Sequence, residues 1–165
     1  MSTLSPMQLK DFVVQLLHVE ANPEFHPHRG SPTKDDLSVN FEMKQRKDGA
    51  QFRIDLDVRL NDSEARYKKC AYRIHIRIYG LFEFDRNTPK EDVDKLLGPN
   101  GLAMAYSVAR GIVAEATGTS LHGKIMLPTV NFIELLKRKA ESAKGKRAAG
   151  KSRARDHGSK KEQTT

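Results

Sequence analysis

Apolar and polar residues alternate along three successive segments of the chain, 36–44, 52–60 and 72–78. A period of two residues predicts β-strands with one apolar and one polar face. The connections between them are short and polar, with Lys47-Asp48-Gly49 as a turn signal and Asn61-Asp62-Ser63-Glu64 closing the second strand. Three strands joined in this way predict an antiparallel meander.

A fourth apolar segment precedes the meander. Leu9, Phe12, Val13, Leu16 and Leu17 satisfy helical spacing, but 12–19 is rich in residues that favour strands and leads into Asn22-Pro23. We predict a strand here, with a helix as the alternative.

The period changes after Phe84 and predicts helices. Thr88-Pro89 indicates the start of a short helix that Gly98 ends, and Asn100 is predicted to cap a longer helix over 101–117. An extended crossover follows Gly118, and a last helix begins near Asn131. The sequence therefore predicts an α+β fold, a four-stranded antiparallel sheet with two main helices on one face.

The longer helix is apolar on nearly all sides, so more than one neighbour must cover it. Small side chains along it allow a second backbone to approach closely. We predict that Ala105, Ala109 and Ile112 contribute to an interface between subunits. Cover by the chain's own crossover is the alternative.

The excess of positive over negative charge is confined to the end of the chain. The 165 residues carry a net charge of +8, with 29 Lys and Arg against 21 Asp and Glu. From Lys137 onward there are 11 against 3, so the first 136 residues carry 18 of each. We predict that 141–165 is a flexible basic tail that contacts nucleic acid weakly or binds an acidic partner, or alternatively keeps the protein dispersed. The candidate binding residues are Lys144, Lys146, Arg147, Lys151, Arg153 and Arg155.

No arrangement of residues indicates catalysis. Asp55 and Asp57 share one strand face, but Arg53 and Arg59 flank them, which favours a salt lattice over acid/base chemistry. We expect no enzyme activity, cofactor or metal. The single cysteine, Cys70, excludes a disulfide within the chain, and no apolar run is long enough to span a bilayer, so we expect a cytoplasmic protein without membrane insertion.

The crossover is the best candidate for binding. Leu121, Ile125, Met126 and Leu127 place apolar side chains in a segment without regular structure, and methionine adapts to ligands of different shape. These residues predict a groove for varied apolar polypeptides. Ordinary core under a loop is the alternative.

Three segments carry a resemblance to a known family. At Gly80-Leu81-Phe82, across 102–110, and above all at Leu127-Pro128-Thr129-Val130-Asn131-Phe132, the sequence resembles the SecB export chaperones. That family combines a strand ending in a Gly-Ile/Leu-Phe step, a helix containing Pro-Tyr-Ala-Arg, a crossover, and a similar entry to the last helix. The resemblance predicts a chaperone domain over 1–140, followed by the tail.

The resemblance implies an ATP-independent holdase that binds unfolded polypeptides in apolar grooves and assembles as a dimer of dimers. It extends the groove to Val130 and Phe132 and places Ile74, Ile76 and Ile78 in the sheet and subunit contacts. A role in protein export or in protecting an antitoxin of a toxin–antitoxin system follows. A nucleic-acid- or ribosome-associated protein acting through the tail is the alternative.

Two features depart from the family pattern. Ser107-Val108 stands where the family has Pro-Tyr, and Tyr106 is displaced by one place. The export chaperones are acidic, which suits a basic module of the translocation motor, whereas this chain has a neutral body. The motor is therefore not assumed as a partner.

Overall fold

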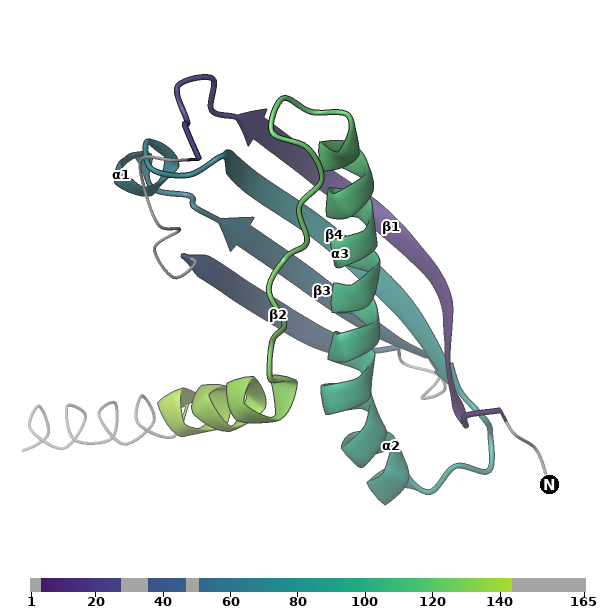
Figure 1. Ribbon diagram of the computed structural model, residues 1–165. Helices are drawn as coiled ribbons and strands as arrows, with labels where there is room; N and C mark the ends of the chain where they lie inside the picture. The colour runs from purple at the N-terminus through teal and green to yellow at the C-terminus, as the bar shows by residue number, and fades with distance from the viewer. Residues whose placement is uncertain (1–3, 28–35, 47–50, 144–165) are drawn as a thin grey trace, which may run out of the picture. The chain divides into compact units, whose positions relative to one another are not determined.

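The computed structural model describes residues 4–27, 36–46 and 51–143. It forms two units, 1–130 and 131–165, and each is described by itself. The first unit contains the strands β1 (Met7–Ala21), β2 (Leu37–Gln45), β3 (Gln51–Leu60) and β4 (Tyr72–Phe84). They form one antiparallel sheet in the order β1-β4-β3-β2 (Figure 1), which confirms the α+β class, the meander and the strand predicted for the first segment.

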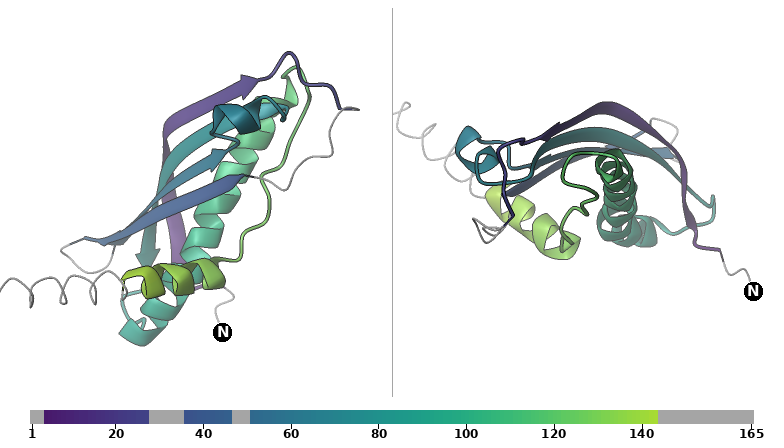
Figure 2. Two further views of the ribbon diagram at one scale, coloured as in Figure 1. Left: turned by 90° about the vertical axis from the view of Figure 1, so that its left-hand side faces the viewer. Right: turned by 45° about the horizontal axis from the view of Figure 1, so that its top comes forward.

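Helices connect and cover the strands. A one-turn helix α1 (Glu64–Tyr67) precedes β4, and α2 (Lys90–Leu96) follows it. The long helix α3 (Leu102–Gly118) packs on one face of the sheet, which curves around it (Figure 2). The segment after α3 then returns along that same face beside the helix (Figures 1 and 2).

The apolar face of the sheet and the inward side of α3 form the core. From β3 and β4, Ile54, Val58, Ile74 and Ile76 are completely buried, and from α3 so are Leu102, Ala109 and Val113. This is the outcome of strict alternation, because every second residue of these strands points at the helix.

The junction between α2 and α3 differs from the prediction. Gly98 does not end a helix and Asn100 does not cap one; a π-helical turn, Leu97–Gly101, joins α2 directly to α3. The wider turn accommodates Pro99, which has no N–H to donate. Gly101 allows a close approach to the sheet, because a Cβ there would lie 2.7 Å from Cδ1 of Ile54. Packing against β3 therefore overrides the local stop signals.

Asn61 ends β3 with a left-handed backbone, φ 55°, which asparagine adopts more readily than most residues. Its side-chain amide donates to the carbonyl of Tyr72 at 3.0 Å, which links the ends of β3 and β4. The turn signal at 47–49 lies outside the described residues.

The second unit begins with a helix, as predicted. Helical residues run from Phe132 through 143, the last residue described. The Asn131 side chain accepts a hydrogen bond from the N–H of Glu134 at 3.2 Å and so caps the first turn.

Candidate functional site

Three hydroxyl groups hold the crossover, here residues 119–130, to the rest of the first unit. The hydroxyl of Tyr72 donates to the Gly123 carbonyl at 2.8 Å, and that of Tyr106 donates to the Pro128 carbonyl at 2.6 Å. Between them, the hydroxyl of Thr117 accepts from the N–H of Ile125 at 3.0 Å. The crossover therefore has a fixed path although it has no helix or strand.

Some side chains of the crossover point into the core and others point outward. Leu127 is completely buried, whereas Met126 beside it is 51% exposed and Leu121 is 67% exposed. Ile125 is half-buried. Of the residues predicted to line a groove, Leu127 therefore fastens the crossover to the core, and Leu121 and Met126 present apolar surface.

A pocket of about 230 Å³, here named the crossover pocket, lies between the crossover and the neighbouring ends of the strands. Most of its lining is apolar, and Lys69 is the one charged residue among those that form it. The main contributors are Phe25, Leu60, Lys69, Cys70, Ile125 and Met126.

A second, more open hollow of about 470 Å³ lies on the other side of the crossover. Gly111, Ala114 and Gly118 of α3 line it, together with Glu115, Lys124 and Met126. Met126 borders both hollows and is the centre of the candidate site. Val130 ends the first unit and Phe132 belongs to the second, so their place in the groove stays a prediction.

The residues predicted at a subunit interface lie mostly inside the chain. Ile74, Ile76 and Ile78, together with Ala105 and Ala109, have at most 1% of their surface exposed, and Ile112 is half-buried. The five buried side chains fill the core of the chain itself, and their part in an interface between subunits stays a prediction. The alternation along β4 and the helical period of α3 place these side chains on the faces that point into the core. The small residues that α3 leaves exposed are Ala103, Ser107, Gly111 and, at its end, Gly118.

Strand β1 has exposed apolar residues on the face that α3 covers elsewhere. Phe12, Val14 and Leu17 pair with Gly80, Ile78 and Ile76 of β4 and so share their face. Their exposed fractions are nevertheless 44, 40 and 41%. Because β1 is also an edge of the sheet, this strip offers both apolar surface and unpaired backbone groups.

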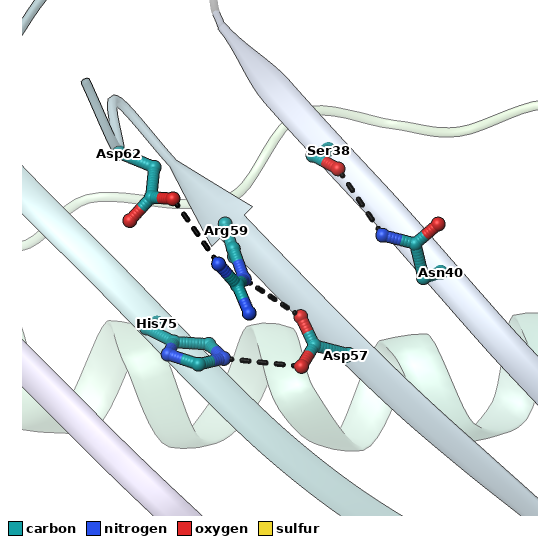
Figure 3. Close-up of polar contacts among 6 residues, drawn as sticks. All are labelled: Ser38, Asn40, Asp57, Arg59, Asp62 and His75. Carbon is teal, nitrogen blue, oxygen red and sulfur yellow. Dashed lines mark hydrogen bonds and ion pairs between the residues drawn. The ribbon is translucent and has the colours of Figure 1, made fainter.

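The opposite face of the sheet carries the predicted salt lattice. Asp57 accepts from Arg59 at 3.1 Å and contacts Nε2 of His75 at 3.1 Å, and Arg59 also reaches Asp62 at 3.2 Å (Figure 3). On β2 beside them, Asn40 donates to Ser38 at 3.4 Å (Figure 3).

Asp55 is held in the same way as Asp57, by Arg53 and by Lys44, the latter at 3.3 Å. Burial alone raises the pKa of both carboxyls. The hydrogen bonds from Arg53 and Lys44 to Asp55, and from His75 and Arg59 to Asp57, outweigh burial, so each pKa is below its ordinary value. Both are therefore structural carboxylates instead of an acid/base pair.

Three further features concern metal sites, membrane-spanning helices and the basic residues near the end of the chain. Among residues 4–27, 36–46 and 51–143, no three histidine, cysteine or acidic side chains are arranged to hold a metal ion. None of the described helices is long and apolar enough to cross a membrane. The six basic residues from Lys144 to Arg155 lie outside the described residues, so a nucleic-acid or acidic partner for them stays a prediction.

The sequence did not reveal the hydroxyl anchors. Tyr106, one place away from the family's tyrosine, is buried and still reaches the crossover. Thr117 is completely buried in an apolar helix and also donates to the Val113 carbonyl at 2.8 Å. A hydroxyl group buried among core residues needs a hydrogen-bond partner. A threonine and a tyrosine within an otherwise apolar helix were therefore the features of the sequence that could have indicated these anchors.

Comparisons with known proteins agree with this arrangement. The model of the family described as preprotein translocase subunit SecB matches residues 5–143. A solved SecB-like chaperone of Mycobacterium tuberculosis, in complex with a ChAD peptide from the HigA1 antitoxin, superposes with a TM-score of 0.56 at 15% identity, covering 76% of this chain and 91% of that one.

A protein of unknown function from Streptococcus agalactiae gives a TM-score of 0.41 at 18% identity, covering 74% of this chain and 97% of that one. No curated protein sequence matches the chain. The family match extends from before the first strand to the end of the described terminal helix, and the chain belongs to the SecB family of preprotein translocase subunits.

Proposed function

We propose that the protein is an ATP-independent chaperone that binds non-native polypeptides along the crossover. One observation carries the proposal: the crossover is fixed at three hydroxyl anchors yet leaves Leu121 and Met126 exposed, and Met126 borders two hollows. A rigid support with adaptable apolar side chains suits ligands of varied sequence. Membership of the SecB family supports the same reading.

Binding of this kind needs no covalent step. Burial of apolar surface stabilises a complex by roughly 25 cal/mol per Å² and has no directional requirement, so clients can differ in sequence. The Mycobacterium tuberculosis relative was solved with an antitoxin peptide, which supports a polypeptide as the ligand class. Export and antitoxin protection both fit this mechanism.

We also propose that copies of the chain associate as a dimer of dimers. The exposed strip of Phe12, Val14 and Leu17 along the β1 edge supports one interface, because a second copy there buries apolar surface and pairs open backbone groups. The small exposed residues Ala103, Ser107 and Gly111 support a second, because they allow another helix to approach α3 closely.

Suppression of aggregation tests the chaperone proposal. Light scattering of a chemically denatured client is followed during refolding with and without the full-length protein. We expect suppression by the wild type and a severalfold weaker effect for the double variant Leu121→Ser, Met126→Ser. Met43→Ser on β2 removes a methionine of similar exposure, 42%, and serves as the control.

The variants separate two explanations of the result. Equal suppression by all three proteins contradicts a client site at the crossover, and no suppression by the wild type in excess contradicts the chaperone function itself.

Sedimentation velocity of Val14→Asp tests the assembly: we expect smaller species than for the wild type, and an unchanged sedimentation coefficient rejects the β1 interface.

A further inference from the structure

We propose that the crossover pocket selects client segments in which acidic side chains lie beside apolar ones, with Lys69 as the residue that recognises the acidic group. The inference rests on the proposed chaperone function and specifies the ligand chemistry of the same site. An apolar pocket alone accepts any apolar side chain, so discrimination has to come from the polar groups placed around it.

The charges around the pocket favour an anionic ligand. Lys69 lines the pocket, and Lys124 lines the neighbouring hollow that shares Met126. Arg66 and Lys68 are neighbours of Lys69 at the end of α1. Lys69 and Lys124 therefore place one cationic side chain at each of the two hollows that an extended polypeptide would cross.

Two carboxylates close to the pocket residues in sequence are engaged by other cations. Glu64 of α1 is held by Arg73 at 2.5 Å, and Asp62, which follows Asn61 of the pocket, is held by Arg59 at 3.2 Å. Glu24, which precedes Phe25 of the pocket, is exposed. Asp36 is exposed as well, and its carbonyl accepts a hydrogen bond from the N–H of Asn61. In the hollow, Glu115 offsets Lys124. Lys69 itself is exposed, and none of the ion pairs among the described residues, such as those of Arg59 and Arg73 nearby in sequence, includes it.

Size and geometry limit the ligand to a side chain or two. A pocket of about 230 Å³ accommodates one large apolar side chain, not a folded partner. The ammonium group of Lys69 sits on a flexible stem and can meet a carboxylate at the next positions of the ligand. An extended segment in which acidic residues follow apolar ones therefore fits best.

The single cysteine of the chain provides the measurement. Cys70 lines the pocket, so a bound peptide slows its alkylation by iodoacetamide without any engineered label. The probes are three peptides with one frame, acetyl-Gly-Leu-Phe-X-Leu-Phe-X-Gly-amide, in which X is aspartate, asparagine or lysine. The full-length protein is used, and every alkylation rate is divided by the rate of the same variant without peptide.

We expect the aspartate peptide to protect Cys70 at about threefold lower concentration than the asparagine peptide, the size expected of one exposed ion pair. The lysine peptide should protect least. The preference should shrink with added salt, because exposed charges are screened beyond about 3 Å at 1 M ionic strength.

Two variants assign the preference to one residue. Lys69→Gln should remove the advantage of aspartate over asparagine, whereas Lys90→Gln, which removes an equal charge at the start of α2, should keep it. The basic end of the chain is present in all proteins, so its attraction for acidic peptides cancels in the comparison.

Each contrary outcome has a distinct meaning. Equal protection by the three peptides, or a preference that survives Lys69→Gln, overturns the inference. Absence of protection by any peptide while aggregation is still suppressed overturns the pocket as a client site but leaves the chaperone function standing. Absence of both overturns the proposed function.

Discussion

Strands β3 and β1 flank the same central strand, β4, yet their surroundings differ. Both place apolar residues on the face of α3, although β3 alternates strictly and β1 is interrupted by two register shifts. In β3 this set, Phe52 to Leu60, is at most 8% exposed, whereas in β1 Phe12, Val14 and Leu17 are about five times more exposed. The pattern of a strand thus says which face is apolar, and the position of the helix decides how much of that face is closed.

The polar faces differ as well. β3 contributes Asp55 and Asp57 to a lattice that includes Lys44 of β2 and His75 of β4. The ion pairs of β1 are fewer and longer, with Glu20 at 3.4 Å from Arg73 and Lys10 at 3.5 Å from Glu83. We therefore expect β3 and β4 to form the stable half of the sheet and β1 the half that depends on a partner.

The largest effect is expected where the two halves meet. Ile76 and Leu17 are opposite each other in the β1–β4 ladder, but Ile76 is completely buried and Leu17 is not. Ile76→Ala should lower the free energy of unfolding by about 2–5 kcal/mol, and Leu17→Ala by less than about 1 kcal/mol in a single chain.

Urea denaturation at several protein concentrations measures both. A loss for Leu17→Ala that approaches the loss for Ile76→Ala, and that depends on protein concentration, means that a second copy covers β1. Equal losses without any dependence on concentration contradict the difference between the halves.

A pair of glycines gives the next largest contrast. A Cβ at Gly101 would collide with Ile54, so Gly101→Ala should destabilise the protein by about 1–3 kcal/mol. At Gly111, in the exposed middle of α3, a Cβ would meet no atom of the described residues within 4 Å. In a single chain with no neighbour on this face, Gly111→Ala should therefore stabilise the protein by about 1 kcal/mol through helix propensity. Thermal unfolding of both variants checks the signs, and a destabilised Gly111→Ala indicates that another helix occupies this face.

Strand periodicity was sufficient to predict three strands of the sheet, because the alternation in 36–44, 52–60 and 72–78 is strict. For the first strand, Met7–Ala21, the β-favouring residues of 12–19 correctly outweighed the helical spacing of its apolar residues. The junction at Gly98 and Asn100 was wrong, because local stop signals carry less free energy than burial of Leu97 and Leu102 against the sheet.

The candidate site was predictable in composition but not in orientation. The crossover was identified from Leu121, Ile125, Met126 and Leu127, yet nothing in an irregular segment says which side chain points inward. Burial of Leu127 and exposure of Met126 follow from the hydroxyl anchors on β4 and α3, which are distant in sequence.

A smaller effect is expected at the crossover, where the hydrogen bond from Tyr106 can be removed without changing the sheet. Tyr106→Phe removes the hydrogen bond to Pro128 and should cost about 0.5–1.5 kcal/mol, since a half-buried carbonyl loses its donor. Amide hydrogen exchange should show faster exchange at the crossover, while the exchange of β3 stays unchanged. Tyr79→Phe is the matched control, because the Tyr79 ring lies under Arg53, 3.8 Å from its guanidinium carbon, on the opposite face of the sheet. Faster exchange in β3 for Tyr106→Phe contradicts a local role for the anchor.

The smallest effect concerns acid stability and the polar face of β3. The pKa values of Asp55 and Asp57 are lowered in the folded protein, so their contribution is fully present above the ordinary value near 4 and is lost as the pH falls through the folded values. The free energy of unfolding should therefore decrease with falling pH below about 4, and Asp57→Asn should flatten that decrease. Asp94→Asn, an exposed carboxylate of α2, is the control. If urea titrations from pH 5 to pH 2 give the same slope for Asp57→Asn and the wild type, the lattice does not stabilise β3, and burial under α3 alone accounts for the difference between the two strands.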